Sequence, residues 1–256
     1  MELSKLINNA FIYADDLFSK FELEGVVCYP SADKHCCLSC TTNDGLVFLY
    51  NKDKQDNYTL KEFGLRKWSP IHAILDMRDY EDNDSISITP EEDEFGFPKI
   101  LYFQVGKVRM THYLQNYTFI SNQTDLLNLY KQKKFELIKA KDSIKQSLSK
   151  EVVKTAGRMA TMLNEKFFRI GGASGSNYLY FGDENQSIDF AKLDLGNIGG
   201  ISTWKNDTYF SYDYFSQLYR AMGSDNVRIN VTPTQIIMMA DDEKSLKIGI
   251  LRGKVM

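Results

Sequence analysis

The sequence predicts an α+β protein made of two copies of one unit, each with helices on one face of antiparallel sheets. Two observations predict this fold class. Amphipathic stretches with apolar residues at helical spacing alternate with short strand-like runs, in the order helix, strands, helix, strands. The same order then occurs again, beginning roughly 140 residues further along the chain. A repeat describes architecture rather than chemistry, so it favours a binding or ring-forming protein over an enzyme.

The repeat is clearest where a helix-like stretch leads into strand-like runs. The first of these runs reads Ile-Ser-Ile-Thr-Pro in the first half and Ile-Asn-Val-Thr-Pro in the second. The matching segments are 71–75, 86–90 and 100–103 in the first half, and 214–219, 229–233, 236–239 and 247–250 in the second.

The first half opens with a helix from Leu3 to Phe18, whose apolar residues recur at helical spacing. Pro70 is compatible with the next helix because it lies in the first turn. An acidic loop, from Glu91 to Pro98, joins two strands of a hairpin. The elements expected here are strands at 21–28, 35–42 and 46–50, a helix at about 66–77, and strands at 86–89 and 99–105.

Residues 121–146 differ from both halves. They include many lysines, few glycines and no prolines, so they lack the composition of a flexible tether. We expect a partly helical linker there, between an N-terminal domain at 1–120 and a C-terminal domain at 147–256. The linker lysines either form a solvated face or touch nucleic acid.

Charge and hydropathy exclude several classes of protein. The formal net charge of −3 argues against a uniformly basic DNA-coating protein, although a local basic stripe is compatible with it. No apolar run approaches the roughly 20 residues that cross a bilayer, and the N-terminus has no signal segment. We expect a soluble, cytoplasmic chain without a membrane partner.

The cysteines raise the question of a metal site. The chain has four, all in its first fifth: Cys28, Cys36, Cys37 and Cys40. Cys37 and Cys40 have zinc-knuckle spacing beside His35, but the second pair of a zinc signature is absent. Cys36 and Cys40 share one face of a predicted strand. We interpret the cysteines as reduced and packed like small apolar side chains; a metal site and redox chemistry are the open alternatives.

The sharpest functional pattern follows Ser149, the expected N-cap of a helix to Leu163. Lys150, Lys154 and Arg158 recur at intervals of four and form one stripe. An apolar stripe faces nearly the opposite way: Val152, Ala156, Met159 and Leu163. Such a row is either an ordinary solvated face or a set of phosphate contacts. Weaker candidates on the other helices are Lys5, Lys20, Arg66, Lys67 and Arg220.

These patterns together resemble a DNA polymerase sliding clamp, most of all the two-domain clamps of tailed phages. The resemblance rests on the doubled order of elements, the Leu3-Ser4-Lys5 opening, the Leu65-x-x-Trp68 pattern, and a tail at 209–251 that reads helix, Gly-Ser-Asp turn and antiparallel run. It implies a homotrimeric viral replication ring that encircles double-stranded DNA and tethers a DNA polymerase for processivity, after a clamp-loader ATPase opens it. It implies no catalysis and no cofactor, and for a phage protein it implies the host cytoplasm.

The resemblance also implies roles for particular residues. It places DNA contacts in the pore on Lys150, Lys154, Arg158, Lys5, Arg66 and Arg220. It places a groove for a partner's apolar peptide on Leu126, Leu129, Ile250 and Leu251.

Three alternatives remain on sequence grounds. One is a clamp-like processivity subunit that binds DNA without encircling it, as in herpesviruses. Another is a single-stranded-DNA-binding protein, although sheet packing explains aromatic residues such as Tyr178 and Tyr180. The third is a carboxylate-dependent nuclease using Asp76, Asp79 and Glu81. Enzyme interpretations are weak, because the three histidines are scattered and the glycine-rich run at 171–176 lacks the lysine of a phosphate-binding loop.

Overall fold

The computed structural model forms two compact units, and each is described by itself. The first unit is Met1–Phe135 with Asp241–Lys247, and the second is Glu136–Ala240 with Ile248–Met256. The structure describes residues 3–21, 23, 25–30, 36–42, 44–52, 61–77, 86–116, 144–173, 176–182, 189–196, 208–223, 227–232, 234–243 and 245–255.

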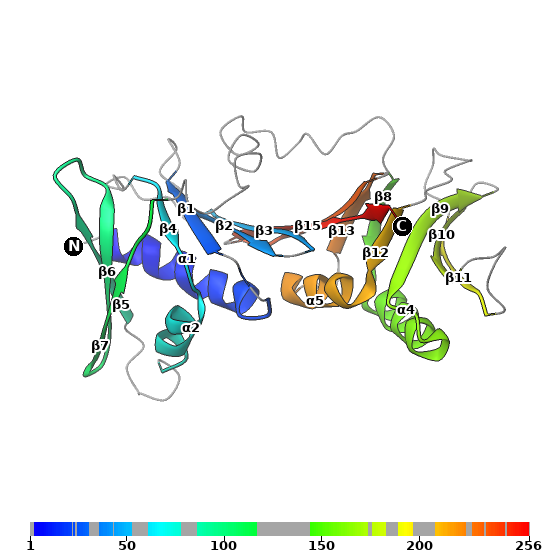
Figure 1. Cartoon of the computed structure of the whole chain (residues 1–256), viewed down its shortest axis with the longest axis horizontal. Coiled ribbons are helices and arrows are strands. Elements are labelled where there is room, and N and C mark those ends of the chain that lie inside the picture. Colours follow the sequence, from blue (N-terminus) through cyan, green and yellow to red (C-terminus); the bar gives the residue numbers. More distant parts are fainter. Residues whose placement is uncertain are drawn as a thin grey trace. The chain divides into compact units, whose positions relative to one another are not determined.

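In the described part of the first unit, helices α1 and α2 accompany two antiparallel groups of strands (Figure 1). The strands β4-β1-β2-β3 form one group and β5-β6-β7 the other. Helix α1 packs on β2, β3 and β5, and α2 packs on β6. The elements are α1 Leu3–Phe18, β1 Gly25–Pro30, β2 Cys36–Thr42, β3 Gly45–Asn51, β4 Phe63–Leu65, α2 Ser69–Asp76, β5 Ile86–Glu92, β6 Pro98–Val105 and β7 Val108–Tyr113.

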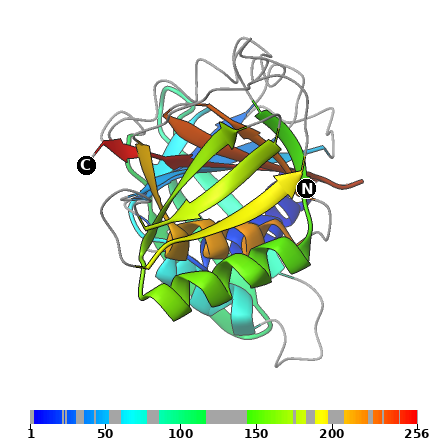
Figure 2. The same ribbon diagram turned by 90° about the vertical axis from the view of Figure 1, so that its right-hand side faces the viewer.

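The second unit repeats this plan and extends it. One group of strands has the order β11-β10-β9-β12-β16, and the other has the order β15-β14-β13-β8. The ends of β14 and β15 that form their hairpin, Asp241 and Ser245–Lys247, belong to the first unit. Figure 2 shows β9, β10 and β11 face-on, with α4 beside them. The elements are β8 Ile144–Leu148, α4 Lys150–Leu163, β9 Phe167–Ala173, β10 Ser176–Phe181, β11 Ala191–Gly196, β12 Thr208–Ser211, α5 Tyr212–Met222, β13 Val227–Val231, β14 Gln235–Asp241, β15 Ser245–Arg252 and β16 Lys254–Val255.

The two units are therefore copies of one topology. The order β4-β1-β2-β3 corresponds to β12-β9-β10-β11, because in each case the strand before the second helix returns to pair with the first strand. Likewise β5-β6-β7 corresponds to β13-β14-β15, α1 to α4, and α2 to α5. The duplication predicted from the sequence is confirmed.

Aromatic side chains fill the core of the first unit. Phe11 of α1 stacks on Trp68 with ring centres 5.4 Å apart and lies 6.0 Å from the ring of Phe103 on β6. Phe18, two turns further along the same face of α1, meets Trp68 edge-on at 5.2 Å. Trp68 thus joins the end of α1 to the start of α2. Since α1 buries its apolar stripe here, the periodicity read from the sequence is confirmed.

Phe168 is the centre of the core of the second unit. Its ring lies 5.1 Å from Phe215 of α5, 5.8 Å from Phe210 and 5.9 Å from Phe181. Helix α4 comes close to α5 at Gly157, where a Cβ would lie only 2.6 Å from the Tyr212 hydroxyl oxygen. The absence of a side chain at this position therefore permits the close approach.

Several boundaries differ from those expected. Helix α2 begins at Ser69 rather than near Arg66, because Trp68 is anchored in the core. Glu91 belongs to β5 rather than to a loop; its carboxylate accepts hydrogen bonds from Tyr102 and Lys99 of β6. Residues 144–146, expected in the linker, begin β8, which pairs with β13. Residues 121–143 lie outside the described part of the chain. No described helix is long and apolar enough to span a membrane.

Candidate nucleic-acid interface

Helix α4 carries the predicted cationic stripe on a well-defined helix. The Ser149 side chain accepts a hydrogen bond from the Val152 N–H at 3.3 Å, so it caps the helix as predicted. At the other end Asn164 has a left-handed backbone, with φ 54°, and its N–H bonds back to the last turn. Hydrogen bonds therefore satisfy backbone groups at both ends of the helix. Because the two ends are held, the direction in which the side chains of α4 project is fixed.

Lys150, Lys154 and Arg158 are all exposed on α4. Successive cations are separated by about 6 Å along the helix, because four residues each rise about 1.5 Å. Glu151 is the acidic residue of the first turn. A stripe with this spacing can contact the phosphates of a nucleic-acid backbone without reading bases.

The buried face of α4 differs from the stripe expected. The helix buries Val153, Ala156 and Ala160, whereas Met159 is half-buried. The buried face is rotated by about 60° from the predicted stripe. Contact with α5 explains the rotation, because the Tyr212 hydroxyl donates a hydrogen bond to the Val153 carbonyl at 3.0 Å. The cations nevertheless stay on the solvent side.

The other predicted cations are spread over separate elements. Arg66 and Lys67 are exposed but precede α2 rather than lying on it. Arg220 is exposed in the last turn of α5. Lys5 lies in α1, where the structure describes no side chain before Ala10. The structure therefore places three of the predicted cations in one row on α4, whereas the other described candidates lie on other elements.

The described side chains of α1 and α2 in the first unit include exposed aspartate but no lysine or arginine, whereas α4 exposes three cations beside Glu151. Asp16 is exposed on α1 and Asp76 on α2. Asp15 is engaged internally: it accepts a hydrogen bond from Trp68 Nε1 at 2.8 Å and lies 2.9 Å from Nδ1 of His72. This bond to Asp15 raises the pKa of His72 above its ordinary value.

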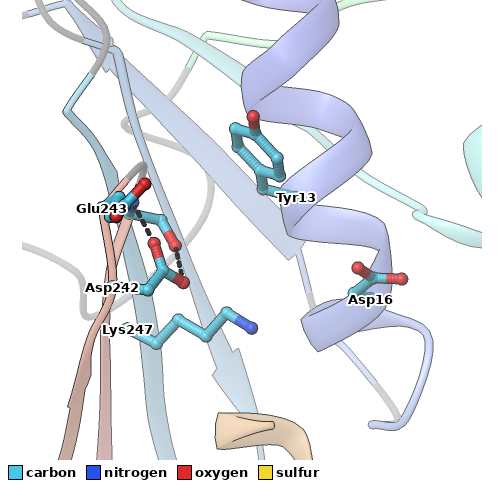
Figure 3. Close-up of a pocket in the computed structure, with 6 residues that line it drawn as sticks. Tyr13, Asp16, Asp242, Glu243 and Lys247 are labelled. Carbon is cyan, nitrogen blue, oxygen red and sulfur yellow. Dashed lines mark hydrogen bonds between the residues drawn. The ribbon is translucent and has the colours of Figure 1, made fainter. Parts of the chain in front are cut away.

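A cavity of ≈ 350 Å³ next to α1 reinforces this acidic character (Figure 3). Asp242 in its wall accepts hydrogen bonds from both the N–H and the hydroxyl of Ser245. Its lining consists of Tyr13, Asp16, Asp242, Glu243, Ser245 and Lys247. With three carboxylates and one ammonium group, the cavity is unfavourable for phosphate.

Two of the four predicted groove residues can be placed. Ile250 and Leu251 lie in β15, and their exposed fractions are 8% and 0%. Leu126 and Leu129 lie outside the described residues. The groove for a partner peptide remains a prediction.

Among the strands that end the described sheets, β7 and β11 each belong to a different unit and carry apolar side chains that are only partly covered. Strand β7 pairs with β6 and β11 pairs with β10, each on one side. On β7 the core-facing Val108, Met110 and His112 are half-buried, and Leu193 of β11 is half-buried as well. An edge with unpaired backbone groups and partly covered apolar side chains is a template for pairing with another chain. Sequence reasoning missed these edges, because strand order is not visible in one sequence.

The described residues hold no group of three or more His, Cys, Asp or Glu side chains placed to bind a metal ion. Cys28 and Cys36 are buried, and their sulfur atoms lie 3.5 Å apart in a thiol hydrogen bond, not a disulfide bond. Burial raises the pKa of the Cys40 thiol far above its ordinary value, so this side chain stays neutral. His35, Asp79 and Glu81 lie outside the described residues, as does the side chain of Cys37.

Comparison with known proteins gives matches among solved structures alone. No protein-family model and no curated protein matches the sequence. The chain is similar to A. fulgidus PCNA, solved with the C-terminal region of FEN-1, with a TM-score of 0.62, 12% identity, and coverage of 96% of this chain and 95% of that one. For PCNA from Thermococcus kodakaraensis the TM-score is 0.61, the identity 10% and the coverage 96% of each chain.

Bacterial clamps are similar over part of their length. The H. pylori beta clamp gives a TM-score of 0.66 at 12% identity, and the match covers 96% of this chain but 63% of that one. These likenesses show that the chain has the α+β clamp fold, with antiparallel sheets and helices arranged as in PCNA and beta clamps.

Proposed function

We propose that this chain, which has the fold of DNA sliding clamps, is itself a sliding clamp that encircles double-stranded DNA and tethers a replicative polymerase. The observation that carries the proposal is the complete doubled topology, which matches PCNA over nearly the full length of both chains. In this proposal the domains at 1–120 and 147–256 are the two similar segments of each subunit. The chain acts through topology and weak phosphate contacts, with no chemistry of its own.

The free edges of β7 and β11 support a ring of identical subunits. Antiparallel pairing of β7 in one copy with β11 in the next can place Arg109 opposite Asp194, both exposed. The same register places half-buried Met110 opposite half-buried Leu193. One alignment therefore joins opposite charges on one face and apolar side chains on the other. A chain with two different edges forms a head-to-tail contact, which closes into a ring when the rotation allows it.

The pore role falls on Lys150, Lys154 and Arg158, supported by their exposure along one capped helix. Arg66, Arg220 and Lys5 are the further candidates. A polymerase and a loader ATPase are the proposed partners, and a partner's apolar peptide is the proposed ligand of the groove. The binding of FEN-1 by A. fulgidus PCNA supports such a peptide-binding role. A phage origin and a cytoplasmic location belong to the same proposal.

Solution mass by light scattering over a range of concentrations tests the ring. We expect three times the chain mass of 29.5 kDa. Arg109→Asp or Asp194→Arg alone should dissociate the ring, because each sets like charges opposite one another, and the double variant should restore it. Lys107→Asp, in the neighbouring turn, is the matched control and should leave the mass unchanged. A strict monomer at every concentration would instead indicate a subunit that binds DNA on one face.

Encirclement has its own test. Protein assembled on closed circular duplex DNA should stay bound through a high-salt wash and be released when the circle is cut once, because a ring slides off a free end. Equal release before and after cutting would show that the chain binds without encircling.

A further inference from the structure

The face of the second unit's sheet that points away from its helices carries an unusual set of side chains. Side chains alternate between the two faces of a strand. On one face Phe168, Phe181 and Phe210 are buried toward α4 and α5. Most of the alternate positions on β9, β10, β11 and β12 are half-buried or exposed, although Gly171 of β9 is buried. We call this second surface the outward face.

One row crosses the outward face at right angles to the strands. Tyr209 of β12 is paired with Lys254 of β16, and Tyr180 of β10 is paired with Arg169 of β9 on one side and Lys192 of β11 on the other. The guanidinium carbon of Arg169 lies 5.4 Å from the centre of the Tyr209 ring, which joins the two halves of the row. The order across five strands is thus Lys254, Tyr209, Arg169, Tyr180 and Lys192: cation and tyrosine alternate.

More aromatic surface adjoins this cross-strand row. The ring of Tyr178 lies 5.8 Å from that of Tyr180, and the ring of Phe190 lies 6.1 Å from it on the other side, at an interplanar angle of 29°. Nζ of Lys192 lies 5.0 Å from the centre of the Tyr178 ring. These rings are half-buried, so they form a partly exposed aromatic surface between the cations.

The described side chains of the face include more cations than acids. Asp194, opposite Tyr178, is the acid on the described part of the face, and it accepts a hydrogen bond from the Gly196 N–H at 2.7 Å. Arg169 donates from Nη2 to the Gly182 carbonyl at 3.4 Å, whereas its buried Nε has no hydrogen-bond partner among the described residues. A guanidinium with an unused donor is suited to a phosphate oxygen.

We propose that the cross-strand row binds single-stranded nucleic acid, with the strand running across β16, β12, β9, β10 and β11. Neighbouring strands lie about 4.8 Å apart, so the three cations recur at about 10 Å along the row and can follow a flexible phosphate backbone. Unpaired bases stack on the tyrosine rings between them. Paired bases present only their edges, so a duplex does not use the rings. An acidic peptide would pair with the cations but would not stack on the tyrosine rings.

This site is separate from the proposed pore, although Lys192 shares strand β11 with the proposed subunit edge. It lies on the opposite face of the sheet from α4, whose cations are the proposed duplex contacts. A clamp with this second surface would hold an unpaired strand outside while duplex passes through its pore.

Fluorescence anisotropy of a labelled oligothymidine of about twelve nucleotides, a length within the range of known single-strand sites, tests the proposal. For three phosphate contacts we expect log Kd to rise with log salt concentration with a slope of about 2. Lys192→Glu with Lys254→Glu should weaken binding at least about tenfold and lower that slope below about 1. Both side chains are exposed, so the variant should fold.

The matched control is Lys150→Glu with Lys154→Glu, the same charge change on the other face. It should leave oligothymidine affinity within about twofold while weakening duplex binding. Tyr180→Leu should also weaken oligothymidine binding, and an abasic oligonucleotide of equal charge should bind the wild type less tightly, because stacking is lost.

Three results would overturn the proposal. Wild-type affinity in the Lys192→Glu and Lys254→Glu variant would show that the row is not used. An equal loss in the α4 control would assign the binding to the other face. Equal affinity for the abasic strand, or for a glutamate peptide of the same charge, would reduce the face to a nonspecific anion surface.

Discussion

Helices α1 and α4 occupy the same place in the two repeats, but their described residues expose different chemistry. Helix α4 exposes Lys150, Lys154 and Arg158 in one row, whereas α1 exposes Asp16 beside a cavity with two further carboxylates. The duplication therefore preserved the architecture and not the surface. In the proposed ring, phosphate contacts are concentrated on the second repeat, and the first supplies mainly structure.

The outward faces of the two equivalent sheets differ in the same way. In the first repeat this face is itself buried: Val27 and Ser39 have 0% exposure and Phe48 has 2%. In the second repeat this face carries half-buried tyrosines among cations.

The helix ends of the two repeats differ too, because α4 and α5 have serine N-caps whereas α2 has no side-chain cap. The second repeat is thus both better capped and more open to ligands.

The largest effect should come from the packing of α5 on β15. A Cβ at Gly249 would lie 2.7 Å from Cγ of buried Leu218, so the Gly249→Ala variant must displace the helix. We expect a loss of about 2–3 kcal/mol in the free energy of unfolding, measured with urea. Ala73→Gly, on the exposed side of α2, is the contrasting variant in the first repeat and should cost about 1 kcal/mol. An unchanged midpoint for Gly249→Ala would show that α5 does not need this close approach.

Alanine replacement of Lys150, Lys154 and Arg158 tests the contrast between the helix faces directly. Loss of three phosphate contacts should weaken duplex binding roughly 30-fold at low salt, about 2 kcal/mol, and leave the assembly mass intact. The first-repeat set Lys20, Lys67 and Lys107, all exposed, removes the same charge and should change affinity by less than about threefold. Equal losses in the two sets would abolish the proposed asymmetry, and unchanged loading on DNA by the α4 variant would remove its cations from the pore.

Ser149→Ala tests the capping difference. Removing the oxygen that accepts the Val152 N–H should lower the free energy of unfolding by about 1 kcal/mol, seen in thermal or urea unfolding. Ser149→Asp should retain most of that stability, since aspartate caps as well as serine does. If alanine and aspartate behave alike, the cap does not anchor α4.

The smallest effect should be a pH dependence confined to the first repeat. The hydrogen bond to Asp15 raises the pKa of His72, helped by the charges of Asp15 and Asp76 and opposed by burial. Since the folded pKa exceeds the unfolded one, this stabilisation is complete below the ordinary value of 6.5 and disappears as pH rises through the folded pKa. The difference in melting temperature between wild type and His72→Gln should therefore shrink with rising pH. A difference that grows above neutral pH would contradict this assignment.

Local patterns predicted the features that depend on neighbours in sequence. The Ser149 cap, the cationic row of α4, and the alternation of helices with strands all follow from spacing along one element. The predicted buried stripe of α4 was wrong because contacts with Tyr212 at Gly157 rotate the helix toward α5. These two residues are distant in sequence, so no local pattern shows the contact. Likewise, Trp68 fixes the start of α2 through its contacts with α1.

The outward face shows a deeper limit of sequence reasoning. Tyr178 and Tyr180 were attributed to sheet packing, since an alternating run does not reveal whether its second face is covered. The answer depends on strand order: Arg169, Tyr180 and Lys192 form a row only because β9, β10 and β11 are neighbours in register. No pattern within one strand carries that information.

The first unit is discontinuous in sequence, and this has a consequence for synthesis. Its last segment, Asp241–Lys247, is the site of the Lys52–Asp241 ion pair and of one wall of the acidic cavity. A ribosome makes the chain from its N-terminus, so the first unit cannot be completed until residue 247 has emerged. During translation the second unit's helices are therefore available before the first unit is finished, and a nascent chain that stalls before Asp241 leaves the first unit open to chaperones.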